Sequence, residues 1–127
     1  MKDVKFFRCN HCGNIVEMIN ESGVPIVCCG ENMHELVPNT SDGAGEKHVP
    51  VVNVEKDNVV VRVGSVDHPM LPEHYIQWIY VQTNLGGMKK YLNPNEGPTA
   101  SFKLAEGESV VAVYEYCNLH GLWKTTL

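Results

Sequence analysis

A cysteine and a histidine near the end of the chain form a candidate metal site. Two residues separate Cys117 from His120, and one tight turn at this spacing brings a thiolate and an imidazole to a single point. Residues 109–116 read as a buried β-strand, so the pair lies where a rigid element ends. The alternative is a buried cysteine beside a surface histidine. The choice depends on whether other residues can complete the site.

Three histidines in the middle of the chain can complete it. His48 and His74 flank predicted strands, and His68 lies in a proline-containing loop. A single histidine is more often an ordinary polar residue than a ligand, but loops gathered at one end of a rigid sandwich are where such sites are built. Four imidazoles and one thiolate exceed the four ligands of tetrahedral zinc. They suit iron in a square pyramid with one open position.

Four cysteines near the beginning of the chain form a second candidate site: Cys9, Cys12, Cys28 and Cys29. A Cys-x-x-Cys followed by a second pair is the pattern of a tetrathiolate site, in which the first pair wraps the metal and the second closes the tetrahedron. Gly13 can adopt the positive φ that the first turn requires. Consecutive side chains of an extended chain point to opposite faces, so Cys28 and Cys29 can share one metal only if the backbone bends. A zinc-filled structural knuckle is the alternative to iron.

The other two histidines are not expected to bind metal. His11 lies inside the first cysteine pair, where four thiolates already complete the metal's shell, and we predict a surface position for it. His34 has no partner pattern and is interpreted as structural.

The composition indicates a soluble protein of one modest β domain with a small appendage. The chain has 127 residues, 43% of them hydrophobic, and a formal net charge of −5. The acidic balance makes a nucleic-acid partner unfavourable. No apolar run is long enough for a membrane span, and the N-terminus lacks a signal peptide's hydrophobic core. We therefore predict a cytoplasmic protein, where the cysteines stay reduced and bind metal.

The pattern of strands and turns predicts an all-β chain with two domains. Residues 1–37 form the cysteine-rich segment, and the polar, glycine-bearing stretch 38–45 is the boundary that opens the domain 38–127. No segment has a convincing helical period. Strands are expected at 49–55, 58–63, 75–83, 87–92, 100–104, 109–116 and from 122 onward. About seven short antiparallel strands are typical of an immunoglobulin-like β-sandwich.

Taken together, these motifs resemble a known family. Residues 8–16 with 27–33 are similar to the desulforedoxin-type iron module. The segments Glu-Lys-His-Val-Pro, His-Pro-Met with Glu-His-Tyr-Ile-Gln-Trp-Ile, and Cys-Asn-Leu-His-Gly-Leu-Trp-Lys resemble the superoxide reductases. The whole chain is similar to desulfoferrodoxin, the two-iron form of that family, and no ligand position departs from the family pattern.

The resemblance implies two non-haem iron ions per chain. One would be held by Cys9, Cys12, Cys28 and Cys29; the other by His48, His68, His74 and His120 as equatorial ligands, with Cys117 axial. The implied reaction is the one-electron reduction of superoxide to hydrogen peroxide without release of dioxygen, as a defence against oxidative stress. A rubredoxin-like electron donor and a homodimer are implied as partners. From the turn geometry we also expect the backbone N–H groups of Leu119 and His120 to point at the axial sulfur.

Two charged residues beside His48 are predicted to act in catalysis. In an extended chain Glu46 and Lys47 point to opposite sides, so only one faces the open position at a time, and the stretch 43–45 is flexible enough to allow movement. In line with the family, Lys47 would face the reduced site and attract superoxide, and Glu46 would bind Fe(III) after turnover. Three other lysines, Lys89, Lys90 and Lys124, would contribute if the fold brings them near.

Two other functions compete with the enzyme. An electron carrier would use the tetrathiolate iron and the sandwich as a docking module, but it has no use for four histidines around a fifth thiolate. A zinc-stabilised interaction domain has no use for an open coordination position.

Overall fold

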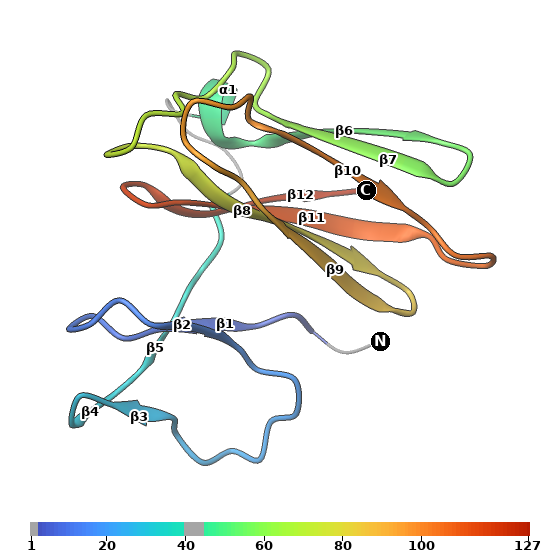
Figure 1. The fold of residues 1–127 in the computed structure, drawn as a ribbon. Helices are drawn as coiled ribbons and strands as arrows, with labels where there is room; N and C mark the ends of the chain where they lie inside the picture. Colours follow the sequence, from blue (N-terminus) through green and yellow to red (C-terminus); the bar gives the residue numbers. More distant parts are fainter. Residues whose placement is uncertain (1–2, 40–44) are drawn as a thin grey trace. The chain divides into compact units, whose positions relative to one another are not determined.

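Short antiparallel strands joined by tight turns make up almost all of the regular structure, as the sequence predicts (Figure 1). The computed structural model describes residues 3–39 and 45–127. It divides the chain into two compact units, Met1–Val37 and Pro38–Leu127. The Gly43–Ala44 stretch, expected to be flexible, lies outside the described residues. Within the described ranges, no helix is long and apolar enough to cross a membrane.

The first unit consists of very short strands that frame two turns. They are β1 (Phe6–Arg8), β2 (Ile15–Glu17), β3 (Val27–Cys28), β4 (Glu31–Asn32) and β5 (His34–Glu35), arranged as a β2-β1-β5 sheet and a β3-β4 hairpin. Gly13 has a φ of 82°, as predicted for the β1–β2 turn. In the β3–β4 turn, Cys29 and Gly30 have φ values of 53° and 74°. This is the bend that adjacent cysteines require, and two consecutive positive φ values are typical of a tight hairpin turn.

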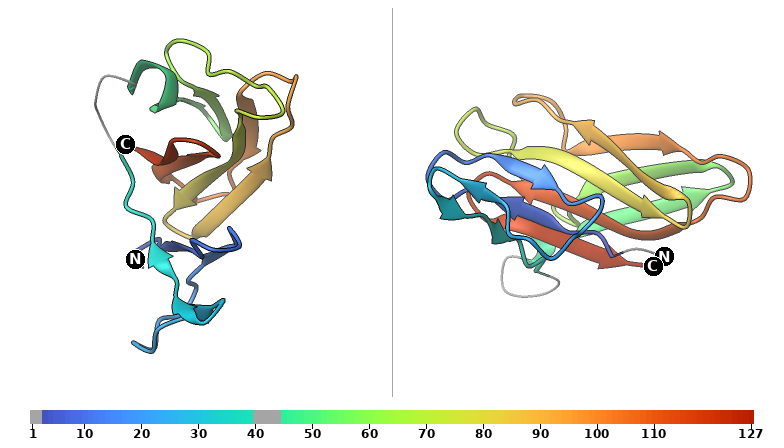
Figure 2. Two further views of the ribbon diagram at one scale, coloured as in Figure 1. Left: turned by 90° about the vertical axis from the view of Figure 1, so that its left-hand side faces the viewer. Right: turned by 90° about the horizontal axis from the view of Figure 1, so that it is seen from below.

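The second unit is a sandwich of two antiparallel sheets, as predicted (Figure 2). One sheet has the order β10-β7-β6 and the other β12-β11-β8-β9. The strands are β6 (Pro50–Glu55), β7 (Asn58–Val63), β8 (Ile76–Thr83), β9 (Gly86–Tyr91), β10 (Thr99–Lys103), β11 (Val110–Cys117) and β12 (Gly121–Thr126). Alternate residues of β7 (Val59, Val61 and Val63) are fully buried, because successive side chains of a strand point to opposite faces.

The short helix α1 (Gly45–His48) corrects the prediction that this segment is extended. Four residues are too few to give a helical period in the sequence. Pro50 opens β6 and has no N–H to continue a helix, so α1 ends where the strand begins.

The strand register brings five strand ends to one end of the sandwich. Pro50 of β6 pairs with Val63 of β7, and Cys117 of β11 pairs with both Ile76 of β8 and Gly121 of β12. The segments that adjoin these ends are α1, residues 64–75 and the β11–β12 turn, and they lie at the same end of the sandwich in Figure 1. These segments carry the predicted histidine ligands.

Candidate metal centres

The sandwich gathers all five predicted ligands of the second site. Their ligand atoms lie within 4.8 Å of one another and come from His48, His68, His74, Cys117 and His120. His48 ends α1, the next two histidines lie between β7 and β8, Cys117 is the last residue of β11, and His120 lies in the following turn. Residues distant in the sequence thus meet because the strand ends meet.

The four imidazoles form a closed ring. Each is edge-on to its two neighbours in the order His48, His68, His74, His120, with centroid separations of 4.7, 4.7, 5.1 and, back to the start, 4.9 Å. The Cys117 sulfur lies 3.5 Å from Nε2 of His68 and 3.7 Å from Nδ1 of His120, which are opposite members of the ring. The five donors therefore form a ring of four nitrogens with a sulfur against it.

These donors fit a metal ion. His48 Nε2 lies 3.2 Å from both His68 Nε2 and His120 Nδ1. Ligands at right angles, each about 2.1 Å from a metal, would be about 3.0 Å apart. His74 Nε2 is buried and has no hydrogen-bond partner among the described residues, a costly arrangement that a metal would relieve. Imidazole suits iron, copper, nickel or zinc, and five donors are more than structural zinc uses.

The surroundings of His68 and His74 favour the neutral imidazoles that bind metal. His68 Nδ1 donates to the Pro69 carbonyl at 2.7 Å, which leaves the Nε2 lone pair free for a metal. Burial is the main cause that lowers the pKa of His68 to about 4. Burial, followed by the charge of His120, also lowers the pKa of His74. Both rings are therefore neutral at pH 7, as metal binding requires.

The Cys117 thiol is subject to opposing influences. Burial is the largest cause that raises its pKa. The backbone N–H groups of Leu119 and His120 lower the pKa, as the sequence predicts for this turn. A bound metal cation would deprotonate the thiol, and these N–H groups would then stabilise the thiolate.

Glu115 is a buried acid that sequence reasoning missed. Its side chain is fully buried, and neither carboxyl oxygen has a hydrogen-bond partner among the described residues. Burial raises its pKa well above the usual range, so the group is neutral in the folded protein. The available signal was the alternation along β11, which places residues 113, 115 and 117 on one face.

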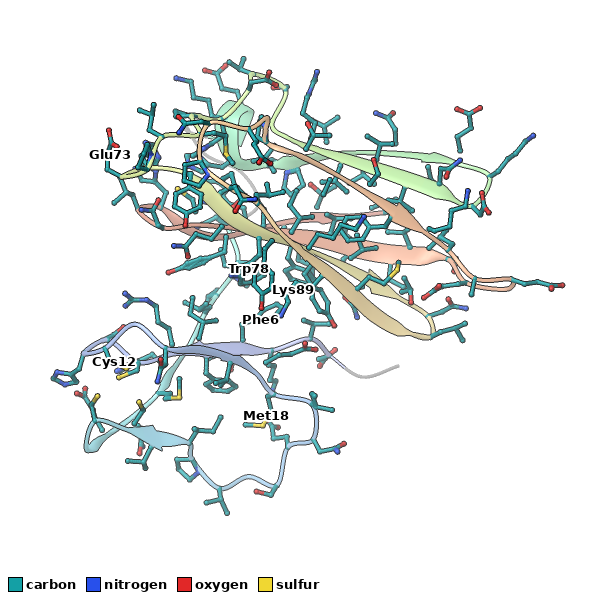
Figure 3. All side chains as sticks on the ribbon, viewed as in Figure 1. Phe6, Cys12, Met18, Glu73, Trp78 and Lys89 are labelled. Atoms are coloured by element: carbon teal, nitrogen blue, oxygen red, sulfur yellow. The ribbon has the colours of Figure 1, made fainter. Side chains whose placement is uncertain are left out.

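Two further residues that the sequence analysis did not single out hold the ligand loops together. Asn118 Oδ1 accepts from the Tyr75 N–H, and its Nδ2 donates to the Glu73 carbonyl, both at 3.0 Å. Glu73, labelled in Figure 3, lies in the loop before β8. Trp123 stacks on the His48 ring at 4.6 Å, and its Nε1 donates to the His120 carbonyl at 3.1 Å. These contacts fix the loops that carry the ligands.

The helix changes the geometry expected for the two charged residues beside His48. Successive side chains of a helix are about 100° apart, so Glu46 and Lys47 do not point to opposite sides as an extended chain would require. Both side chains are exposed. After burial and the charge of His120, the charge of Lys47 also contributes to the lower pKa of His74.

The other candidate lysines have partners on the sandwich strands. The Lys90 ammonium donates to the Ser101 carbonyl. Lys89 lies over the Tyr91 ring at 4.7 Å, and Lys124 over the Tyr114 ring at 5.4 Å. Lys47 is therefore the stronger candidate for attracting an anion.

The four cysteines of the first unit also come together. Their ligand atoms lie within 4.8 Å of one another, two from the β1–β2 turn, where Figure 3 labels Cys12, one from the end of β3 and one from the β3–β4 turn. The sulfurs of Cys12 and Cys28 are 3.6 Å apart. Two thiolates bound tetrahedrally at about 2.3 Å from a metal would be separated by about 3.8 Å. Hydrogen bonding, first from the Cys12 backbone N–H, lowers the pKa of Cys9 to about 6.

The two remaining histidines belong to neither group. Both are exposed, and both face Glu31: His11 Nε2 lies 2.5 Å from one carboxylate oxygen, and His34 Nε2 lies 3.5 Å from the other. His11 is thus a surface residue, as predicted.

Fold and sites together define an all-β protein with two candidate metal centres, one of four cysteines and one of four histidines and a cysteine. The desulfoferrodoxin family model matches residues 40–126, and the model of the desulfoferrodoxin N-terminal domain matches residues 2–36. The chain belongs to the desulfoferrodoxin family.

Individual relatives match almost the whole chain. The desulfoferrodoxin of Nitratidesulfovibrio vulgaris is 48% identical over 120 residues, covering 94% of each chain. That of Syntrophotalea carbinolica is 45% identical over 122 residues, covering 96% of this chain and 95% of the relative. Among solved structures, the superoxide reductase from Treponema pallidum is similar with a TM-score of 0.82, at 36% identity and 98% coverage of both chains.

Proposed function

We propose that this protein is a superoxide reductase. It takes up superoxide at the centre of four histidines and one cysteine, adds one electron and two protons, and releases hydrogen peroxide without dioxygen. The single observation that carries the proposal is the ring of four imidazoles with the Cys117 sulfur against it. Five donors would leave a metal that prefers six ligands with one position for substrate. The whole-length similarity to a superoxide reductase supports the same activity.

Iron bound by these five residues would supply the electron. The protein's part is to hold that metal in an electron-rich environment. The four histidines would bind it as neutral ligands, and the Cys117 thiolate would add electron density to it. The N–H groups of Leu119 and His120 moderate the charge on the sulfur.

The first unit would hold a second iron in its four cysteines. We propose residues 1–37 as this iron module and residues 38–127 as the catalytic domain. A rubredoxin-like protein is the proposed electron donor, and a homodimer the proposed assembly. A one-electron carrier is the second candidate function, because two of the four cysteines in the first unit, Cys12 and Cys29, are exposed. A carrier alone would not require the second centre.

Lys47 and Glu46 have different proposed roles toward superoxide. The Lys47 ammonium, whose charge contributes after burial and His120 to the lower pKa of His74, attracts superoxide to a protein that is acidic overall. The Glu46 carboxylate would cover the open side of the site in the oxidised protein and would leave it after reduction.

Lys47→Ala is expected to slow the bimolecular reaction of the reduced protein with superoxide about three- to tenfold, because one attractive charge near the site is lost. The rate in the parent should fall with added salt, since exposed charges are screened over about 10 Å at roughly 0.1 M ionic strength. Glu46→Ala should leave this first reaction fast and change the visible spectrum of the oxidised protein. Pulse radiolysis measures the rates.

Lys56→Ala is the matched control. Lys56 lies in the β6–β7 turn, at the opposite end of β6 from α1, and its replacement changes net charge equally. If Lys47→Ala and Lys56→Ala slow the reaction equally, the slowing arises from the change in net charge and not from the position of Lys47. Equal slowing in Lys47→Ala and Glu46→Ala would contradict the division of roles.

A further inference from the structure

The loop that leads from β7 to His68 is hydrogen-bonded to the backbone of α1. The Val66 N–H donates to the Glu46 carbonyl at 2.9 Å, and the Ser65 hydroxyl donates to the same oxygen at 3.1 Å. The carbonyl between the two proposed functional side chains thus has two donors from another part of the chain.

The sequence explains why this carbonyl needs outside partners. In an α-helix the carbonyl of residue 46 accepts from the N–H of residue 50. Residue 50 is Pro50, which has no N–H, so the helix cannot satisfy the Glu46 oxygen itself. A carbonyl left without a donor here would destabilise α1. Ser65 and Val66 supply the hydrogen-bond donors in place of the N–H that Pro50 lacks.

Gly64 allows the loop to approach this closely. A Cβ at position 64 would lie 2.6 Å from the Glu46 carbonyl oxygen and 2.9 Å from the Lys47 carbonyl carbon, both backbone atoms. Such contacts are shorter than real Cβ atoms show, so a side chain would push α1 away. Glycine is therefore required by the close packing of the two backbones.

Polar contacts also fix the loop between β7 and His68. Arg62 Nε donates to the Gly64 carbonyl at 3.2 Å and lies 3.7 Å from an Asp67 carboxylate oxygen. The His68 N–H donates to the Val63 carbonyl at 2.9 Å. The same loop thus positions the ligand His68 and, through residues 65 and 66, the helix that carries His48.

We propose that Ser65 is a positioning residue that controls how Glu46 covers the open position. Its hydroxyl, together with the Val66 N–H, fixes the backbone of α1, which carries Glu46. Loss of the hydroxyl loosens α1 and shortens the time that the carboxylate spends over the site. This proposal rests on the proposed function, because it assigns a carboxylate to cover the open position.

The test compares Ser65→Ala with the parent in the full-length, iron-loaded protein. Ser65→Thr keeps the hydroxyl and should behave as the parent does. Ser22→Ala is the matched control: the Ser22 hydroxyl accepts from the Val24 N–H at 3.2 Å in the first unit, so a comparable hydrogen bond is removed elsewhere. The first measurement is amide hydrogen exchange at Val66, which should accelerate about fivefold in Ser65→Ala alone, as expected for one lost hydrogen bond.

The second measurement is the rate at which azide binds to the oxidised protein, followed by the visible spectrum. If Glu46 must leave before azide enters, Ser65→Ala and Glu46→Ala should each accelerate binding several-fold. In the double variant, Ser65→Ala should add nothing further, because the carboxylate that it controls is absent.

Three results would overturn the proposal in different ways. Acceleration in Glu46→Ala without acceleration in Ser65→Ala would refute the positioning role and leave the covering role of Glu46 intact. No effect in Glu46→Ala would refute the covering role itself. A Ser65→Ala effect that persists undiminished in the Glu46→Ala background would show that Ser65 acts on something other than the carboxylate.

Discussion

Cys117→Ser is expected to abolish superoxide reduction and leave the four-cysteine centre intact. The sulfur is fully buried at the end of β11 and lies within 3.7 Å of two opposite ring nitrogens. A serine hydroxyl fits the same space and can accept from the same N–H groups. It stays neutral at pH 7, however, and cannot donate charge as a thiolate does.

Two measurements on the Cys117→Ser variant test this expectation. The thiolate-to-iron absorption band of the oxidised sandwich should disappear, while the absorption of the tetrathiolate centre remains. The rate of superoxide consumption by the reduced protein should fall at least about a hundredfold, a loss larger than that for groups beyond the ligands. A variant that turns over normally would show that the axial ligand is misassigned.

Cys12→Ser should have an equally large effect on the other centre. Within the described part of the first unit, the buried hydrophobic side chains are Phe6, Cys9 and Met33, and no strand exceeds three residues. A core this small would depend on a bound metal for stability. We expect the variant to lose the first iron and its segment 1–37 to become sensitive to trypsin.

The sandwich should be unaffected by Cys12→Ser. Its core comes from its own strands, and its five candidate ligands all lie between residues 48 and 120. Direct reaction of the reduced second centre with superoxide should therefore stay within about twofold of the parent rate. Metal analysis should give one iron per chain in place of two. Loss of both irons would show that the two units depend on each other for metal binding.

The strands and the candidate ligands were accessible to sequence reasoning because their signals are local. Alternating valines predict β7, and the Cys-x-x-His spacing identifies the turn after β11. The structure brings all nine proposed ligands together in two groups. Their binding of iron stays a prediction, as do the electron donor, the homodimer and the cytoplasmic location.

The features that were missed depend on contacts between distant segments. The helix α1 is too short for a periodic pattern, and its end depends on Pro50. Strands β4 and β5 have two residues each, and pairing with a neighbour defines them rather than propensity. Asn118 stands inside a recognisable motif, but its role appears only when the loop at Tyr75 lies beside it.

The stoichiometry of superoxide consumption tests the central claim most directly. The fully reduced, iron-loaded protein is mixed anaerobically with a limiting amount of superoxide, and hydrogen peroxide and dioxygen are both measured. A reductase yields one peroxide for each superoxide consumed, oxidises the second centre in proportion, and releases no dioxygen. Release of one dioxygen for every two superoxide ions consumed, with the centre returned to its starting state, would identify a dismutase and contradict the account.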